Sequence, residues 1–363
     1  MNSKITREPA GLARKTFVDL ERIIELDLVR ATEAGALNTF QWIGKGDKNA
    51  ADQAASDAIR GMFDLIPVSG EVMIGEGIKD NAPGIFLGEK LGSWEDGSLK
   101  LHIAIDPIDG TTNVSKGLPN SISVLAAASP DDSDHNALCN LPSFYCSKIA
   151  YGPRVVSAMK SRKIAATKLE APIEQNLNLV AEALGKRVQN LTVVLLDRPR
   201  HEDLVKRIRS AGAAIRMIGD GDVAGAIAPS LPDSDVDLYC GIGGSTEAVL
   251  AAAAVRCLGG DIQAKMWPRD EKERAALVQQ GHAKDLDRIL SAEDMARGQG
   301  ILFCATGISD SPLLPGIKMT GHFVITHSLV MRAKHRTIRF IRSHHDLTAK
   351  TIRLRSDRKE HKL

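Results

Sequence analysis

Residues 102–113 read HIAIDPIDGTTN, and this stretch crowds two acids, a glycine and two hydroxyl groups behind an apolar run. Asp106 and Asp109 are only three residues apart. Repulsion between neighbouring carboxylates costs free energy unless a cation lies between them. We expect Pro107 to help end the strand and Gly110 to allow a tight turn into the start of a helix. The stretch therefore predicts a charged site at the end of a buried strand.

The part of the chain around this stretch is typical of helices packed on a largely antiparallel sheet. Apolar residues recur near helical spacing over residues 22–43, and a second helix is expected to begin near Asn49. Short strand-like runs follow, namely EVMIGEG, LHIAIDP, SISVLAAAS, KIAYGP and RVVSAM. We therefore assign residues 1–171 to an N-terminal α+β domain that carries most of the candidate metal-binding acids.

The pattern changes near residue 172, where strands and helices begin to alternate. Such alternation indicates an α/β layer with parallel strands. Three of the expected strands end in the polar or glycine-rich sequences DRPRH, GDGD and GIGGSTE. Ligands of such sheets bind beyond the carboxyl ends of the strands, so these three ends predict a binding site. We assign residues 172–347 to a C-terminal α/β domain that contributes the substrate-binding loops and Glu247.

Composition and charge narrow the class of protein. The chain has 363 residues, of which 43% are hydrophobic and 25% charged, and this suits a globular protein of two domains. The formal net charge of +2 gives no sign of a nucleic-acid partner. We interpret the basic tail, residues 348–363, as a solvated terminus rather than a nucleic-acid-binding arm. The longest aliphatic run, residues 249–255, is too short to span a membrane, and we see no signal peptide.

The five cysteines are an odd number without a CxxC pair, which argues for reduced thiols in a cytoplasmic protein. Cys240, Cys257 and Cys304 lie in apolar runs and are expected in the core. Cys139 and Cys146 lie in an expected loop, where they could be exposed. We assign no chemistry to any of the five.

Five acids follow one pattern, in which a strand end or a helix start places a carboxylate close to glycine. They are Asp52, Glu76, Asp106, Asp109 and Glu247. For each acid alone, a helix cap or a turn is the simpler interpretation, because Asp and Glu are favoured there. Together they offer the oxygen ligands that hard divalent cations prefer, in the number that a two-metal site needs. The sequence has no His and Cys cluster of the kind that holds structural zinc.

Two further charged residues have two interpretations each. Lys48 lies four residues before Asp52, so the two side chains share a face if both belong to one helix. The pair is either a surface ion pair, or a site in which the lysine faces an anionic substrate or stabilises the attacking water. Asp80, in EGIKDNAP, is either a base-like carboxylate near the site or a loop acid.

The stretch DPIDGTT resembles the signature of the metal-dependent, lithium-sensitive sugar and inositol phosphatase superfamily. Seven further motifs resemble the class II fructose-1,6-bisphosphatases of bacteria, and the similarity runs in order from about residue 18 to residue 347. These motifs are GKGDKNAADQA, VMIGEGIKDNAP, LDRPRHEDL, GDGDVAGAI, GIGGSTEAV, WPRD and THSLVMR. Inositol-type relatives usually carry a tryptophan-aspartate motif before the late helix, where this chain has GIGGSTEA and Glu247 supplies the acid. The resemblance implies a layered αβαβα sandwich of the sugar phosphatase type.

The resemblance also implies the residues of the site. One metal ion would bind Asp52 and Glu76, and a second would bind Asp106, Asp109 and Glu247, with Mn²⁺ or Mg²⁺ as the ions. By the resemblance, the Thr111 hydroxyl would help to orient the attacking water. On the functional interpretation of each charged residue given above, we count Lys48 and Asp80 as catalytic residues too. Contacts to the substrate would come from Asp109, Gly110, Thr111, Tyr145, Arg198, Pro199, Arg200, Asp220, Gly221, Asp222 and Gly244.

Simple chemistry agrees with several of these substrate contacts. The guanidinium groups of Arg198 and Arg200 match phosphate oxygens, and carboxylates and a phenol suit sugar hydroxyls. Taken without the resemblance, the same residues are equally a solvated arginine loop, a pair of helix-capping acids and a buried tyrosine.

The activity that the resemblance implies is hydrolysis of the 1-phosphate of fructose 1,6-bisphosphate, which gives fructose 6-phosphate and phosphate in gluconeogenesis. The alternative substrates are sedoheptulose 1,7-bisphosphate, alone or as a second substrate, and inositol phosphates. A more remote alternative is a non-catalytic sugar-phosphate sensor, although none of the metal-binding acids is missing. We expect a cytoplasmic homo-oligomer, a dimer or a tetramer, with no nucleic-acid or membrane partner.

Overall fold

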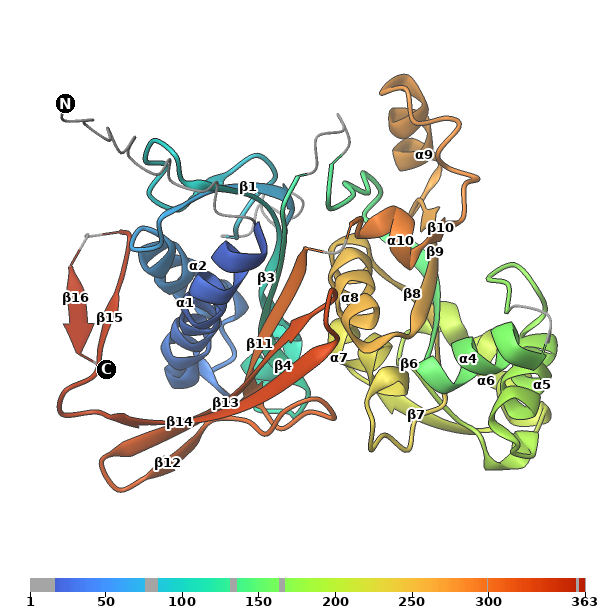
Figure 1. Ribbon diagram of the computed structural model, residues 1–363. Helices are drawn as coiled ribbons and strands as arrows, with labels where there is room; N and C mark the ends of the chain where they lie inside the picture. Colours follow the sequence, from blue (N-terminus) through green and yellow to red (C-terminus); the bar gives the residue numbers. More distant parts are fainter. Residues whose placement is uncertain are drawn as a thin grey trace, which may run out of the picture.

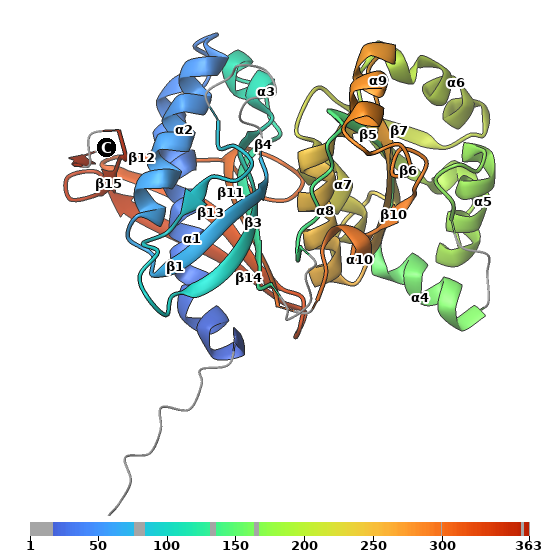
Figure 2. The ribbon, with the colours of Figure 1, turned by 90° about the horizontal axis from the view of Figure 1, so that it is seen from above.

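The computed structural model describes residues 17–75, 84–130, 136–162, 167–298, 300–356 and 359–362. The chain forms five layers, in which two sheets alternate with three layers of helices (Figure 1). From one side to the other, these are α1 and α2, the first sheet, α7 and α8, the second sheet, and α4 to α6 (Figure 2). The expected αβαβα sandwich is confirmed.

The first sheet is mixed but mainly antiparallel, with the order β12-β13-β11-β4-β3-β1-β2 and β14 at the edge beside β13. Within it β1 and β3 are the parallel pair. Its strands are β1 (Val68–Ile74), β2 (Lys90–Leu91), β3 (Leu99–Asp109), β4 (Ser121–Ala128), β11 (Ile301–Ser309), β12 (Lys318–Thr320), β13 (Phe323–Arg332) and β14 (Thr337–Asp346). The helices on its outer face are α1 (Phe17–Thr39) and α2 (Lys48–Phe63), close to the expected bounds.

The second sheet has the order β10-β9-β5-β8-β6-β7. Its strands are β5 (Tyr145–Tyr151), β6 (Thr192–Leu196), β7 (Ala214–Ile218), β8 (Leu238–Gly244), β9 (Asp261–Trp267) and β10 (Leu290–Ser291). The helices around it are α4 (Pro153–Arg162), α5 (Ile173–Leu184), α6 (Glu202–Ser210), α7 (Asp222–Ile227), α8 (Ser245–Leu258), α9 (Glu271–Gln279) and α10 (Ala292–Met295). The predicted parallel arrangement is confirmed for β6, β7 and β8, whereas β5, β9 and β10 are antiparallel to their neighbours.

The two sheets do not divide the chain at residue 171. Strand β5 pairs with β8 and β9 and so lies in the second sheet, whereas β11, β13 and β14 return to the first sheet after the α/β layer is complete. Such pairings join segments far apart in sequence, and a local pattern of strands and helices does not reveal them. The first sheet is therefore completed by strands from the C-terminal part of the chain.

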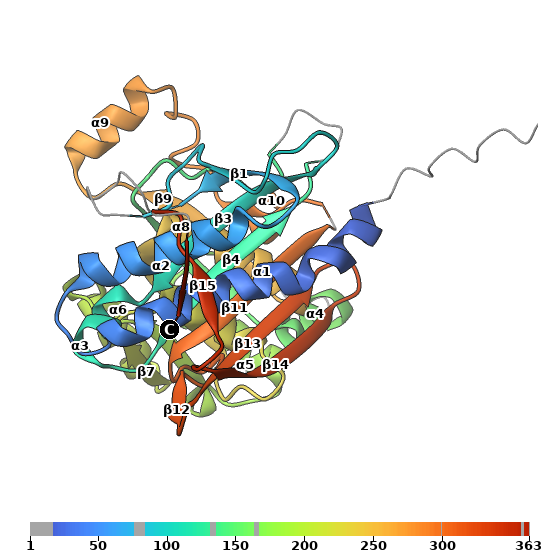
Figure 3. The same cartoon turned by 90° about the vertical axis from the view of Figure 1, so that its left-hand side faces the viewer.

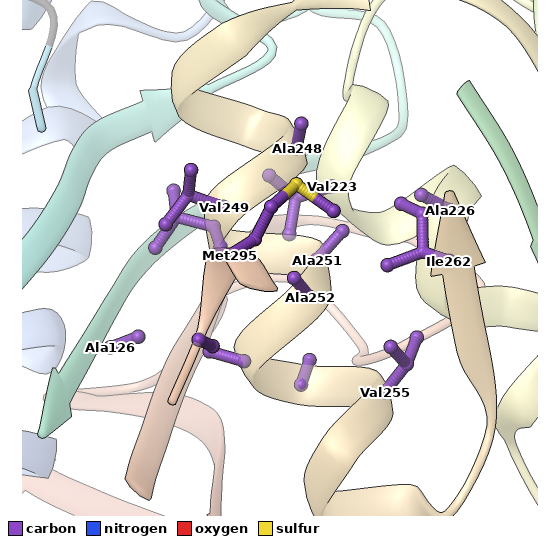
Figure 4. Close-up of a cluster of buried hydrophobic side chains, with 14 of the residues drawn as sticks. Ala126, Val223, Ala226, Ala248, Val249, Ala251, Ala252, Val255, Ile262 and Met295 are labelled. Atoms are coloured by element: carbon purple, nitrogen blue, oxygen red, sulfur yellow. The ribbon is translucent and has the colours of Figure 1, made fainter. Parts of the chain in front are cut away.

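Strand β4 and helix α8 explain how the layers hold together. Leu125 and Ala127 point to α1, and the alternate residues, such as Val124 and Ala126, point to α8, so β4 is buried on both faces. Helix α8 lies between the two sheets, with alanines and valines on all its sides, and Figure 4 shows Ala126 on one side of it and Ile262 on the other. Because its side chains are small, both sheets approach the helix closely.

The end of β3 differs from the prediction. Pro107 does not end the strand, which continues to Asp109. The ladder with β4 pairs Asp106 with Val124 and then Asp109 with Ile122, so the strand carries one extra residue there. A bulge of this kind tolerates proline, which has no N–H to donate to the ladder. Gly110 then adopts a φ of 96° and starts α3 (Thr111–Lys116), so the predicted tight turn is confirmed.

The basic tail is not a solvated terminus, because its described residues fold against α2. Ile352 is 2% exposed and packs with Ala58 of α2. The guanidinium of Arg355 lies 2.5 Å from the Asp64 carboxylate, and the Ser356 amide donates to Asp57 at 2.8 Å. The tail pairs its strands β15 (Thr351–Arg353) and β16 (Glu360–Lys362), and Figure 3 shows β15 in front of the two outer helices.

None of the described helices is both long enough and apolar enough to cross a membrane. Cys240, Cys257 and Cys304 are buried, as predicted. Cys146 is also buried, because it belongs to β5 and not to a loop, whereas Cys139 is partly exposed.

Candidate active site

The ends of β3, β7 and β8 meet the starts of α2, α3 and α8, and most of the predicted site residues gather there. The Thr111 hydroxyl, at the start of α3, donates to the Asp52 carboxylate of α2 at 3.3 Å and to the Ile108 carbonyl at 3.0 Å. Lys48 Nζ lies 2.7 Å from Thr112 Oγ1. Sequence reasoning placed Lys48 and Asp52 on one helix face, and the structure brings both to the end of β3.

Asp220 joins the β7 end to the same place. One of its oxygens accepts the Thr112 amide at 3.0 Å, and the other lies 3.6 Å from an Arg198 nitrogen. Arg198 Nη1 also donates to the Gly219 carbonyl at 2.6 Å. The chain after β6 and the chain after β7 are thereby tied to the first turn of α3.

Asp109, at the end of β3, contacts the first turn of α7 in the layer between the two sheets. Its carboxylate accepts the backbone amides of Asp222 and Val223, each at 2.9 Å. Gly221 lies directly before this turn, where it takes the N-cap position. Asp109 is 3% exposed, so its charge depends on these amides.

The side chain of Asp222 does not point toward a substrate. Its carboxylate is 4% exposed and is held by the buried ammonium of Lys148 on one oxygen and by the Tyr239 hydroxyl on the other. Lys148 Nζ also donates to the Gly244 carbonyl at 3.0 Å. The interpretation of Asp222 as an acceptor for sugar hydroxyls is therefore wrong for its side chain, although its amide helps to hold Asp109.

Gly244 and Glu247 depend on each other at the start of α8. A Cβ atom on Gly244 would lie 1.9 Å from a carboxylate oxygen of Glu247, so any larger residue would displace the acid. Glu247 lies in the first turn of α8, where the helix dipole favours a negative charge. The GIGGSTE motif thus keeps Glu247 turned back toward the end of its own strand.

The second proposed set of metal ligands is only partly assembled. Asp106 is 1% exposed, and one of its oxygens accepts the Ile108 amide at 2.9 Å. Within the described residues, no three His, Cys, Asp or Glu side chains converge into a complete metal site. Glu76 and Asp80 lie outside the described residues. Asp109 still offers lone pairs to a cation, because each carboxylate oxygen has two and the amides use only part of them.

The electrostatics of the site suit a cation. Burial raises the pKa of Asp52 to about 7, and the charge of Asp220 adds to this, although Thr111 and Lys48 oppose it. Burial also raises the pKa of Asp109, helped by the charges of Glu247, Asp222 and Asp220. Carboxylates that raise one another's pKa are stabilised when a divalent cation binds between them. The donor chemistry therefore fits Mg²⁺ or Mn²⁺.

Arg200 and Tyr145 lie together beside the end of β8. Two guanidinium nitrogens of Arg200 donate to the Ile242 carbonyl at 2.8 and 3.2 Å, and its Cζ lies 4.6 Å from the centre of the Tyr145 ring. Tyr145 pairs with Gly244 across the sheet and lies next to the Trp267 ring, with 6.3 Å between ring centres. These contacts fix the guanidinium over an aromatic surface.

His201 holds the loop that carries Pro199 and Arg200. Its Nε2 accepts the Ile242 amide at 2.8 Å, so its Nδ1 carries the proton and donates to the Leu196 carbonyl at 2.7 Å. Burial lowers the pKa of His201, which keeps the ring neutral. Pro199 starts the short 3₁₀ turn that contains both residues.

Sequence reasoning missed three residues that support the site, Lys148, Tyr239 and His201. A lysine within KIAYGP was a signal, because this strand is otherwise apolar and a buried lysine needs an acidic partner. Tyr239 and His201 gave no separate signal, since each reads as an ordinary strand or loop residue.

The arrangement combines buried carboxylates, one hydroxyl held against Asp52, and the cationic side chains of Lys48, Arg198 and Arg200. Such a set can bind a divalent cation and an anionic oxygen of a substrate at adjacent points. Arg198 follows β6 and lies 3.6 Å from Asp220, and Arg200 is held at the end of β8, so both guanidinium groups are placed where an anion can bind.

Comparisons with known proteins agree with this geometry. The family model for bacterial fructose-1,6-bisphosphatase, glpX-encoded, matches residues 22–345. The chain is 42% identical over 339 residues to fructose-1,6-bisphosphatase class 2 of Haemophilus influenzae. The matched region covers 90% of this chain and 97% of that protein. It is 36% identical over 342 residues to fructose-1,6-bisphosphatase 1 class 2 of Escherichia coli K12, which covers 91% of this chain and 97% of that protein. The chain therefore belongs to the family of glpX-encoded bacterial fructose-1,6-bisphosphatases.

Proposed function

We propose that the protein hydrolyses the 1-phosphate of fructose 1,6-bisphosphate and releases fructose 6-phosphate and phosphate. The names of the relatives indicate this substrate. The observation that carries the proposal for this chain is the contact between Thr111 and Asp52 at the end of β3. It lies where the ends of β3, β7 and β8 meet, so the hydroxyl is beside a carboxylate at that point.

We propose that Asp52 and Glu76 hold one divalent cation, and that Asp106, Asp109 and Glu247 hold another. Mg²⁺ or Mn²⁺, when bound, would neutralise the charge of the phosphoryl group and make water a better nucleophile. The raised pKa values of Asp52 and Asp109 support this assignment, because both acids gain from a nearby positive charge.

Thr111 would orient the attacking water. Its hydroxyl proton is directed to the Ile108 carbonyl or to Asp52, so its lone pairs are left to accept a hydrogen bond from water. Lys48, fixed by Thr112, would place a positive charge beside the same point. Asp80 stays a proposed base-like carboxylate.

The second phosphate would lie on the side of Arg198 and Arg200. Tyr145 would offer its hydroxyl to the sugar, and Asp220 and the backbone of Gly110, Gly221 and Gly244 would line the remainder of the site. Arg200 is held by Ile242 and by the Tyr145 ring, which leaves its remaining nitrogen to meet an anion. The cost of ordering this side chain is thus met before the substrate binds.

Phosphate release from a panel of substrates tests the proposal. We expect the highest kcat/KM with fructose 1,6-bisphosphate in the presence of Mn²⁺, loss of turnover in excess chelator, and inhibition by lithium. Higher kcat/KM with sedoheptulose 1,7-bisphosphate or with an inositol phosphate would replace the proposed substrate. Binding without turnover of any member of the panel would identify a sensor.

Replacement of Arg200 by alanine tests the position of the second phosphate. We expect mainly a higher KM for the bisphosphate, by about 10- to 100-fold, because one charge-assisted contact of roughly 1.5–3 kcal/mol is lost. An exposed arginine such as Arg209 provides the control, since Arg209→Ala should leave KM unchanged. A fall in kcat alone would instead move Arg200 next to the transferring group.

We also propose a cytoplasmic homo-oligomer. The described cysteines are free thiols, which suits a reducing compartment. Sedimentation of the purified protein measures the number of subunits.

A further inference from the structure

A cleft of about 740 Å³ lies at the end of α8 that is remote from Glu247. Its basic side chains come from three elements: Lys160 from α4, Arg256 from α8, and Lys334 and Arg336 from the turn between β13 and β14. We call these four residues and the space between them the basic cleft. Figure 2 shows the tip of the β13–β14 hairpin close to α10, beside the end of α8. The first sheet thus supplies one wall and the second sheet the others.

The basic cleft has more positive than negative charge. Arg256 is anchored, because it donates to the Ala296 carbonyl and lies 3.6 Å from Glu293. Asp261, the other acid in the lining, accepts the Tyr151 hydroxyl at 3.2 Å. In the part of the chain that the structure describes, Lys160, Lys334 and Arg336 have no ion pair. The lining therefore carries four cations against two acids, and three of the cations have no ion pair among the described residues.

The backbone at Arg336 is unusual. Its φ is 46°, a left-handed conformation that a long side chain adopts at a cost and that glycine or asparagine would adopt more easily. The guanidinium lies against Gly259, since a Cβ atom there would be 3.1 Å from Nη1. The turn thus holds the Arg336 guanidinium beside the C-terminal end of α8, where it lines the cleft.

We propose that the basic cleft binds a small phosphorylated molecule at a site separate from the substrate site. The volume lies within the range of about 300–1,000 Å³ that is usual for ligand pockets. Two guanidinium groups and two ammonium groups suit the oxygens of a phosphate, whereas an apolar or cationic ligand would leave these charges unbalanced. Helix α8 has 14 residues, so about 21 Å separates its two ends. A ligand here cannot touch Glu247.

The occupant would also connect the two sheets. The β13–β14 turn joins two strands of the first sheet, whereas β9 is a strand of the second sheet and α4 lies on the side of that sheet. A phosphate that contacts Lys334 and Lys160 together would therefore fix the position of one sheet against the other, on either side of α8. Binding at this site does not depend on the proposed activity.

Calorimetric titration of the intact, Mn²⁺-loaded protein with 3-phosphoglycerate tests the proposal, and inorganic sulfate serves as a probe without an organic part. We expect binding of 3-phosphoglycerate that the double substitution Lys334→Glu and Arg336→Glu weakens by more than about tenfold. Arg200→Ala, at the substrate site, should leave this binding unchanged, as should the control Lys318→Glu on β12. The double substitution should weaken the binding of sulfate as well, and sulfate binding that it leaves unchanged would count against the basic cleft as the anion site.

A second variant separates binding from folding. Arg336→Asn keeps a residue that accepts a left-handed backbone, so the variant should melt no earlier than the parent protein while it binds 3-phosphoglycerate more weakly. Absence of binding to the parent protein at millimolar concentration would overturn the proposal. Loss of binding in Arg200→Ala, with full binding in the double variant, would also overturn it, because the ligand would then occupy the substrate site.

Discussion

At its N-terminal end α8 contributes Glu247 to an acidic site, whereas at its C-terminal end Arg256 lines the basic cleft. Both placements agree with the helix dipole, which favours anions at the first turn and cations at the last. The two ends are nevertheless constructed differently. At the acidic end Asp109 and Asp222 are buried, and backbone amides or a buried lysine hold their carboxylates. At the basic end three of the four cations are exposed and lie outside any ion pair among the described residues.

The comparison separates charged groups that need protein partners to be stable in the fold from charged groups that are free to bind a ligand. Asp109 and Asp222 are nearly inaccessible to water, so they need the α7 amides and the ammonium of Lys148 in every state of the folded protein. Lys334 and Arg336 remain hydrated and need no such partners. We therefore expect substitutions at the acidic end to affect folding and chemistry, and substitutions at the basic end to affect binding alone.

The largest effect should follow from Lys148→Met. This change leaves the Asp222 carboxylate buried without its cation, which typically costs about 3–5 kcal/mol of the free energy of unfolding. Lys334→Met at the basic end should change it by less than about 0.5 kcal/mol, as is usual for surface positions. Chemical denaturation of both variants measures the contrast.

A double variant shows whether charge or packing is responsible. Lys148→Met combined with Asp222→Leu removes the pair together and should recover a large part of the lost stability, because no unpaired charge stays buried. Equal losses for Lys148→Met and Lys334→Met would contradict the distinction between the two ends.

The next effect concerns two hydroxyl groups, Thr111 at the acidic end of α8 and Ser291 at its basic end. We predict that Thr111→Ala lowers kcat by about 100-fold or more, the scale of a positioned proton-transfer group, while Thr111→Ser retains much of the rate. Ser291, which caps α10 beside the basic cleft, is the matched control, because Ser291→Ala should cost about 1 kcal/mol of stability and leave kcat unchanged. If the Thr111→Ala protein instead unfolds at a lower temperature and keeps the kcat of the parent protein, Thr111 is a helix cap like Ser291 and has no catalytic role.

A smaller effect is the dependence of stability on pH in excess chelator. The pKa of Asp52 is about 7 in the folded protein and near 3.8 when unfolded, so the folded state binds more protons between these values. Stability should then fall as the pH rises from about 4 to about 7. Asp52→Asn should be more stable than the parent protein at pH 8, because it removes a carboxylate whose charged form is disfavoured by burial. Lys334→Met should keep the slope of the parent protein, and a flat profile for the parent protein would contradict the raised pKa.

Much of the fold could be predicted because local patterns set it. The helices around Asp52 and Glu247 and the turn at Gly110 follow from spacing and from glycine, and these signals are local. The sheet membership of β5 and β11 could not be predicted, because pairing partners far away in sequence decide it. The bulge at Pro107 escaped notice for the same reason, since it depends on the register with β4.

The residues of the candidate site could be predicted where a motif allows a single interpretation of its polar side chain. The motifs singled out Thr111 and Asp52 as separate site residues, and the hydrogen bond between them comes from the structure alone. Asp222 was misread because an acid after a strand can face outward to a ligand or inward to a buried lysine. Only the position of Lys148 on β5, in the same sheet as β7, decides between them. The docking of the tail was missed because Arg355 pairs with Asp64, directly after α2, and with Glu89, which sequence alone does not place beside it.

The central claim is that the acidic end of α8 is a binding site for divalent cations, and direct measurement of Mn²⁺ binding by electron paramagnetic resonance tests it. We predict about two Mn²⁺ ions per chain in the parent protein, the number of a two-metal phosphatase site. Glu247→Gln should lose one of them, while Arg256→Gln at the other end of the helix should lose none. Full Mn²⁺ binding by Glu247→Gln, or none by the parent protein, would contradict the account.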